Sequence, residues 1–119
     1  MALTIKNFIN TLSREYDKKD NSFYLDYIAE DVRWNIIGKK PVIGKKNFIE
    51  AMKKEELESL PVITIKNIIS NGEYVIVESR GKTGIKKGTR FKPAYCDIYR
   101  LKNGKISEVT TYRIDAISK

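Results

Sequence analysis

Residues that commonly carry catalysis or cross-links are scarce in this chain. It contains no histidine, so the side chain most often used as a general base or metal ligand near neutral pH is missing. Its single cysteine, Cys96, cannot form an internal disulfide, which favours a reducing compartment. Without a histidine partner, Cys96 is also a poor candidate for a nucleophile. Histidine-dependent and cysteine-dependent catalysis are therefore disfavoured, and we expect neither a metal nor a cofactor.

Long apolar runs are missing as well. No stretch is long enough to span a membrane, and residues 1–12 show neither a long apolar segment nor a cleavage pattern. With 41% hydrophobic and 32% charged residues, the chain of 119 residues has an ordinary globular composition and is large enough for a core of its own. We therefore expect a single cytoplasmic domain over residues 1–119.

Acidic residues are in deficit, with 15 Asp and Glu against 23 Lys and Arg, which gives a formal net charge of +8. A charge of this size can attract the phosphates of nucleic acids. The lysines, however, occur as scattered pairs, mostly at expected turns and on the outer face of an expected helix. Lysine also outnumbers arginine, which is better suited to binding bases and phosphates. A nucleic acid is therefore the least favoured partner, and a solvated basic surface is preferred.

Apolar residues at helical spacing indicate three helices in the first half of the chain. The helices are expected over residues 4–16, over residues 22–28 and between Gly44 and Pro61. Between the second and third helices, residues 31–37 alternate as in a strand. This alternation places Trp34 and Ile36 on the same side of the strand.

The second half of the chain has the pattern of long strands. Four are expected, over residues 62–70, 74–82, 91–101 and 105–114. Asn103 and Gly104 join the last two, and Asn-Gly between such runs is the strongest short-range hairpin signal. Helices followed by antiparallel strands predict an α+β fold with the helices on one face of the sheet. Several strands are apolar on both faces, so we expect a second copy of the chain to cover the outer face as a homodimer.

The order of these elements and the residues that mark them resemble a known family. The second helix ends in Ala29-Glu30-Asp31, a strand with Trp34 follows, and the run from Asp97 to Leu101 precedes a Gly-Lys-Ile turn. The arrangement resembles the nuclear transport factor 2-like superfamily over essentially the whole chain, and within it the SnoaL-like and ketosteroid isomerase-like branch. The resemblance implies a cone-shaped, cystatin-like α+β fold. In it, a strongly curved antiparallel sheet wraps around about three N-terminal helices, and an apolar pocket opens between them.

Two classes of function follow from the resemblance. Some members are isomerases, cyclases, dehydratases or hydrolases of small hydrophobic compounds, and many are non-catalytic binding or assembly modules, often dimeric. The leading hypothesis is a SnoaL-like protein that binds a small, partly hydrophobic molecule and performs cofactor-independent acid–base chemistry of the isomerase, cyclase or dehydratase type. The alternative is a non-catalytic module of the same fold. The sequence leaves open whether the protein is an enzyme.

The catalytic pattern of ketosteroid isomerases carries over at one position only. That pattern uses a carboxylate base on the first strand, with a tyrosine and a protonated aspartic acid as oxyanion donors. Asp97 stands where the donor aspartic acid would be, but the base position falls on Ile36 or Asn35, and neither can take a proton. The tyrosine position falls near Leu12, and Tyr16 could replace it only with a shifted register. A steroid isomerase is therefore disfavoured.

Asp97 is the centre of the expected site, because it is a carboxylate in the middle of an aromatic and aliphatic strand. If Asp97 faces the pocket, Tyr95 and Tyr99 face it too, since residues two apart share a face of a strand. By analogy with the last strand of the family, Thr111 and Arg113 are expected on the same face.

Glu78 and Arg80 are the candidates from the neighbouring strand, although a slip of one residue would replace them with Val77 and Ser79. Asp97 would act as proton donor or oxyanion partner, Glu78 as base, and Arg80 or Arg113 as charge partner. A structural interpretation competes, in which the two carboxylates and two arginines form a buried salt-bridged network. The pocket walls are expected to include Trp34, Ile36 and Tyr16.

Overall fold

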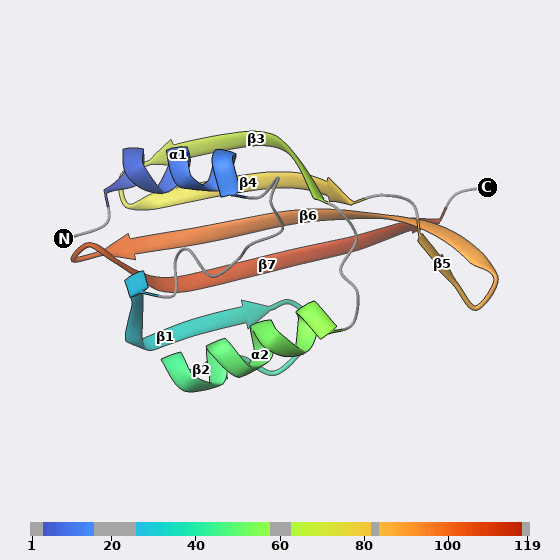
Figure 1. Ribbon diagram of the computed structural model, residues 1–119, viewed down its shortest axis with the longest axis horizontal. Helices are drawn as coiled ribbons and strands as arrows, with labels where there is room; N and C mark the ends of the chain where they lie inside the picture. The colour runs from blue at the N-terminus through green and yellow to red at the C-terminus, as the bar shows by residue number, and fades with distance from the viewer. Residues whose placement is uncertain (1–3, 16–25, 58–62, 82–83, 118–119) are drawn as a thin grey trace.

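The computed structural model describes residues 4–15, 26–57, 63–81 and 84–117. Its helices are α1 (Ile5–Glu15) and α2 (Lys45–Leu57). Its strands are β1 (Ile28–Ile36), β2 (Val42–Ile43), β3 (Ile63–Asn71), β4 (Tyr74–Gly81), β5 (Gly84–Lys86), β6 (Thr89–Lys102) and β7 (Lys105–Ile117). They form one sheet in the order β2-β1-β7-β6-β4-β3, and β5 pairs with β6 beside this path (Figure 1).

The predicted α+β cone fold is confirmed, with one refinement in the sheet. Strand β1 runs parallel to β7, whereas the other pairs of neighbouring strands are antiparallel. A parallel pair requires a long crossover connection, and here the whole chain between the two strands provides it. No short turn therefore constrains the direction of β1, which is why the hairpin signals did not reveal it.

Two-residue turns set the register of the longest strands. Asn103 and Gly104 form the turn between β6 and β7 with φ angles of 55° and 74°. Positive φ at both central residues is the type I′ geometry that an Asn-Gly pair favours. Lys87 and Gly88, with φ of 51° and 78°, form a similar turn that joins β5 to β6. The hairpin expected at Asn103 is therefore confirmed, and the glycines at 81, 84 and 88, which also predict a looser hairpin, flank the β5 hairpin.

Helix α1 begins and packs as its sequence suggests. The Thr4 hydroxyl oxygen accepts a hydrogen bond of 3.1 Å from the Asn7 amide and so caps the N-terminus of the helix. Phe8 is fully buried, and its ring meets that of Tyr99 on β6 edge-to-face at a centroid distance of 5.0 Å. Figure 1 shows α1 lying across β3 and β4.

Helix α2 covers the same face of the sheet as α1, at the edge formed by β1 and β2 (Figure 1). Its Phe48 packs against Trp34 at a ring-centroid distance of 5.0 Å. The helix expected over residues 22–28 lies mostly outside the described residues, and Ile28 already belongs to β1. Neither described helix is both long and apolar enough to cross a membrane.

Together the two helices and the strands enclose one apolar core. Its buried members are Phe8, Ile28, Val32, Trp34, Phe48, Met52, Val75, Val77, Tyr99, Leu101, Ile106 and Val109. We refer to the sheet face that carries Val75, Val77 and Tyr99 as the inner face and to the opposite one as the outer face.

Candidate functional site

Strand pairing places Asp97 on the inner face. Asp97 of β6 lies opposite Val77 of β4 on one side and opposite Thr111 of β7 on the other. Residues directly opposite one another in a pleated sheet project to the same face. Val77 is fully buried in the core, so the side chains of Asp97 and Thr111 also project toward the helices.

A chain of hydrogen bonds across three strands holds this carboxylate. The indole Nε1–H of Trp34 on β1 donates to Thr111 Oγ1 over 2.9 Å. The Thr111 hydroxyl in turn donates to Asp97 Oδ1 over 2.7 Å. Because a buried indole N–H needs an acceptor, Trp34 fixes the orientation of the threonine hydroxyl, whose single proton then points at Asp97. Asp97 Oδ2 has no hydrogen-bond partner among the described residues.

The surroundings of Asp97 favour its neutral form. Burial raises the pKa of the Asp97 carboxyl from 3.8 to about 6, and the hydrogen bond from Thr111 opposes that rise. Desolvation dominates because a single hydroxyl replaces the water that would otherwise surround the charge. Asp97 forms no salt bridge with any residue of the described ranges. The carboxyl can therefore exchange a proton near neutral pH, which is the property needed of a general acid.

Aromatic and basic side chains extend the inner face beyond Asp97. Tyr95 lies opposite Arg113, whose guanidinium stands 5.6 Å from the centre of the tyrosine ring. Arg113 Nε also donates to Asp115 Oδ1 over 3.0 Å, and both side chains are partly exposed. Ile36 pairs with Thr111 in the parallel ladder and packs against the core. The structure thus gathers five further expected residues around Asp97: Trp34, Ile36, Tyr95, Thr111 and Arg113.

The expectation that Glu78 and Arg80 share this face is wrong. Glu78 lies opposite Cys96, not opposite Asp97, so its side chain projects to the outer face of the sheet. The alternative register, shifted by one residue, is the correct one, since Val77 and the buried Ser79 project inward. Tyr99 does face inward, but it is buried against Phe8.

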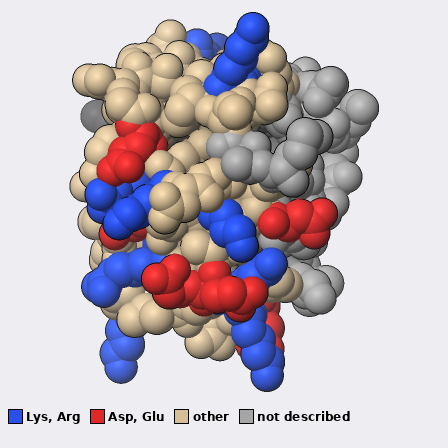
Figure 2. Space-filling view, turned by 90° about the vertical axis from the view of Figure 1, so that its left-hand side faces the viewer, with Lys and Arg blue, Asp and Glu red and all other residues tan. Residues whose placement is uncertain are grey.

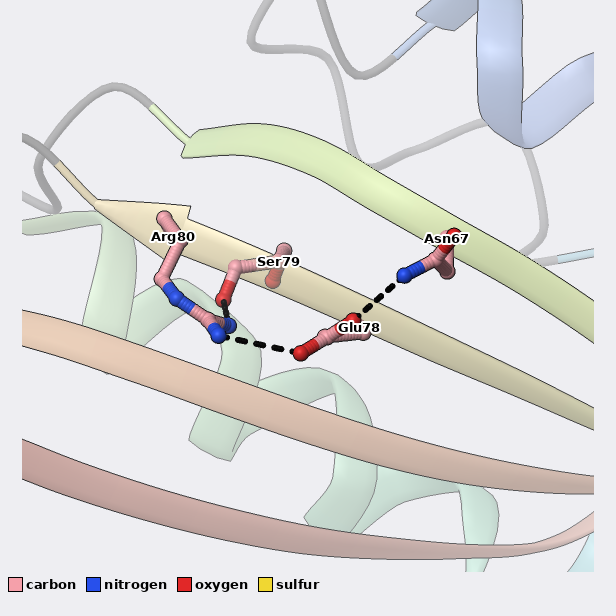
Figure 3. Close-up of polar contacts among 4 residues, drawn as sticks. All are labelled: Asn67, Glu78, Ser79 and Arg80. Atoms are coloured by element: carbon pink, nitrogen blue, oxygen red, sulfur yellow. Dashed lines mark hydrogen bonds and ion pairs between the residues drawn. The ribbon is translucent and has the colours of Figure 1, made fainter.

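On the outer face Glu78 is part of a separate polar cluster (Figure 3). Asn67 Nδ2 donates to Glu78 Oε1 over 2.6 Å, and Arg80 Nη2 donates to Glu78 Oε2 over 2.9 Å. These two hydrogen bonds, from Asn67 and then Arg80, lower the pKa of the Glu78 carboxyl. The expected network that would join both carboxylates to both arginines is therefore absent from the described part of the chain, because the sheet separates Glu78 from Asp97.

The remaining expected site residue, Tyr16, lies outside the described residues. Within the described ranges, no three histidine, cysteine, aspartate or glutamate side chains gather where they could hold a metal ion. Sequence reasoning missed the bond from Trp34 to Thr111. The need of a buried indole N–H for an acceptor is the signal that could have pointed to it.

Charges of both signs alternate at the end of the molecule where the β3–β4 and β6–β7 turns lie (Figure 2). Arg100 and Glu73 form a salt bridge of 2.7 Å there. A surface that binds nucleic acid through phosphates concentrates basic side chains instead. This face therefore lacks the basic stripe that would favour such a ligand.

Comparisons with known proteins agree with this architecture. Residues 9–109 match the family model described as the SnoaL-like domain. A nuclear transport factor 2-like protein of unknown function from Cytophaga hutchinsonii matches 93% of this chain and 100% of that chain, with 26% identity and a TM-score of 0.77. No curated protein matches this chain.

Two further solved structures share the fold at lower identity. An LEH-like epoxide hydrolase from M. tuberculosis is 15% identical, with a TM-score of 0.62 over 89% of this chain and 79% of that chain. A protein with a ketosteroid isomerase-like fold from Catenulispora acidiphila, in complex with trimethylamine, is 16% identical, with a TM-score of 0.65 over 92% and 86% of the two chains. Since the family model covers most of its length, the chain belongs to the SnoaL-like domain family of the nuclear transport factor 2-like superfamily.

Proposed function

We propose that this protein binds a small, partly hydrophobic molecule against the inner face of the sheet and acts on it by cofactor-independent acid–base chemistry. The observation that carries the proposal is the series of hydrogen bonds from Trp34 through Thr111 to Asp97. It holds a desolvated carboxyl with one oxygen fixed and the other without a partner among the described residues. A carboxyl held in this way is suited to donate a proton or a hydrogen bond to a ligand oxygen.

The two oxygens of Asp97 have different roles in this mechanism. Oδ1 accepts a hydrogen bond from the Thr111 hydroxyl, so a proton taken up by the carboxyl resides on Oδ2. A ligand carbonyl or developing enolate placed against Oδ2 then receives a hydrogen bond or the proton itself. Reactions of the isomerase, cyclase or dehydratase type need such a donor. The presence of an epoxide hydrolase among proteins of this fold supports an enzymatic role.

A second candidate is a non-catalytic binding module of the same fold. The observation in its favour is the position of Glu78, the expected base, on the opposite side of the sheet from Asp97. An acid without a base can bind and polarise a ligand but completes no proton shuttle.

A ligand screen tests the site and separates it from the outer face. We expect thermal-shift screening of small acids, planar carbonyl compounds and sterol-like or polyketide-like compounds to find a ligand that stabilises the parent protein. Asp97→Leu, which removes the donor at this position, and Thr111→Val should weaken its binding at least about tenfold, the effect of losing one hydrogen bond to a charged or polarised group. Glu78→Gln is the matched control and should bind like the parent.

Two results would contradict the assignment. Equal binding by the parent and Asp97→Leu would remove Asp97 from the site, and a loss in Glu78→Gln alone would move the site to the outer face. Once a ligand is known, turnover by the parent and its absence in Asp97→Asn would separate the enzyme from the binding module.

We also propose that the protein is a homodimer joined through the part of the outer face nearer the Asn103 turn. Ile69, Ile76 and Ile98 lie opposite one another on β3, β4 and β6 and form an isoleucine row across that face. Ile69 within the row is 57% exposed, and Tyr112, in the adjacent row of the same face, is 45% exposed. Contiguous exposed apolar surface of this kind is typical of an interface between subunits.

The dimer is tested by placing a charge in the isoleucine row. Ile98→Lys should weaken dimerisation by at least about a hundredfold, because an unpaired charge buried in an interface costs several kcal/mol. Light scattering after size-exclusion chromatography measures the mass, and Ile37→Lys, at an exposed position outside the sheet, is the control. A parent protein that stays monomeric at high concentration would refute the proposal.

A further inference from the structure

The outer face of the sheet is hollowed at the end farthest from the Asn103 turn. The hollow has a volume of about 540 Å³, which lies within the range of about 300–1,000 Å³ typical of small-molecule sites. Its lining residues come from β3, β4, β6 and β7, and they are Thr64, Lys66, Arg80, Gly81, Lys92, Ala94 and Ala116. We refer to this hollow as the basic groove.

Four of the residues that line the basic groove are small: Thr64, Gly81, Ala94 and Ala116. Thr64, Arg80 and Ala94 lie opposite one another across three strands, and Ala116 lies opposite Lys92 in the next row. Alanine and threonine at adjacent positions leave space above the sheet that larger residues would fill. The other three lining residues have long, positively charged side chains, so the groove combines small uncharged residues with basic ones.

The residues that line the basic groove carry an excess of positive charge. Lys66, Arg80 and Lys92 contribute three cations, and Glu78 is the carboxylate that pairs with Arg80, over 2.9 Å. Neither Lys66 nor Lys92 forms a salt bridge with any described residue. Lys66 lines the groove together with Arg80, and its charge also lowers the pKa of the Glu78 carboxyl. Two positive charges beside the groove are thus left without an ion-pair partner in the described ranges.

The Arg80 guanidinium is held in place before any ligand arrives. Its Nη2 donates to Glu78, and its Nη1 donates over 3.1 Å to the backbone oxygen of Ser79 (Figure 3). Glu78 is itself fixed by Asn67. A guanidinium has five N–H donors, so further donors remain for a ligand, and little side-chain entropy is lost when they are used.

We propose that the basic groove is a second ligand site, which binds a small anion through a carboxylate or phosphate group. Arg80 supplies directed hydrogen bonds, and Lys66 and Lys92 supply charge without a fixed direction. The groove lies on the opposite side of the sheet from Asp97, so its ligand does not compete with a ligand of the inner face. Much of the attraction is Coulombic and falls as ionic strength rises.

The test is a titration of the ¹⁵N-labelled full chain with inorganic phosphate and, separately, with citrate, at an ionic strength held constant with sodium chloride. We expect saturable shifts of the amide signals of Thr64, Ala94 and Ala116. Tighter binding of phosphate would identify a phosphoryl ligand, and tighter binding of citrate a carboxylate ligand; both support the site.

Two variants and a control distinguish specific binding in the groove from non-specific attraction of anions to a positively charged protein. The double variant Lys66→Gln with Lys92→Gln should weaken binding at least tenfold. The control, Lys102→Gln with Lys105→Gln, removes the same charge at the opposite end of β6 and β7 and should change affinity less than twofold. Ala94→Leu fills the groove without changing its charge and should abolish the saturable shifts. Shifts that never saturate, or an equal loss in both double variants, would overturn the proposal.

Discussion

Asp97→Asn is expected to stabilise the protein at pH 8 by up to about 3 kcal/mol. The folded parent must keep a desolvated carboxylate ionised at that pH, and burial raises its pKa from 3.8 to about 6. A shift of one pKa unit corresponds to about 1.36 kcal/mol. Asparagine retains an oxygen that can accept the hydrogen bond of Thr111 but carries no charge. The variant should therefore be free of the desolvation penalty that the parent bears.

The sign of the pH dependence follows from the direction of the shift. Between about pH 4 and pH 6 the folded protein binds more protons at Asp97 than the unfolded chain does. Stability contributed by this group is therefore fully present below pH 4 and is lost as the pH rises through 6. The difference between the variant and the parent should be small at pH 4, grow up to pH 6 and stay constant above it.

Urea denaturation of both proteins at pH 4, 6 and 8 measures this difference. Asp31→Asn is the control, because Asp31 is an exposed carboxylate on β1. A variant that is less stable than the parent at pH 8 would show that the ionised carboxylate supports the fold, and Asp97 would then be structural. The expected outcome identifies instead a residue that is kept at the expense of stability, as functional groups often are.

Phe8→Ala is expected to lower the free energy of unfolding by about 3–5 kcal/mol, as for other fully buried aromatic residues. Its ring fills the space between α1 and the sheet and meets Tyr99 edge-to-face. Truncation removes this contact and leaves a cavity beside the same strand that carries Asp97.

Chemical denaturation at a single pH measures this loss. The control is Lys6→Ala, an exposed position on the same helix, where the change should stay within about 0.5 kcal/mol. A loss of less than about 1 kcal/mol for Phe8→Ala would mean that α1 does not pack on the sheet as described. Ligand binding by the variant would also be informative, since α1 and the sheet bound the region where the ligand is proposed to lie.

Local signals in the sequence sufficed for most of the fold. The turn at Asn103 and Gly104 follows from the positive φ that this pair tolerates, and it fixes the register of β6 against β7. That register, with alternation along β6, is enough to place Asp97 beside Thr111. The direction of β1 could not be predicted from local sequence signals, because it depends on a pairing between strands at distant points of the chain.

The error at Glu78 has a simple physical origin. Alternation between polar and apolar residues reveals which face of a strand is buried, but Val75, Ile76 and Val77 are all apolar. Because both faces are apolar, a shift of the strand register by one residue moves every side chain to the opposite face without changing the apolar pattern of the sequence. Only the pairing of Val77 with Asp97 resolves it. Apolarity on the outer face is the same property that favours a second subunit there.

The hydrogen bond from Trp34 to Thr111 joins residues 77 positions apart, whereas Asp97 and Thr111 are 14 apart in one hairpin. The hairpin can form from local contacts, but the parallel pairing of β1 with β7 closes a much longer loop at a larger entropic cost. In a nascent or partly unfolded chain the β6–β7 hairpin alone would leave Asp97 in water, with the acidity of an ordinary carboxylate. We therefore expect Asp97 to donate protons near neutral pH only after β1 has paired with β7, so that chains lacking this pairing would not carry the proposed acid.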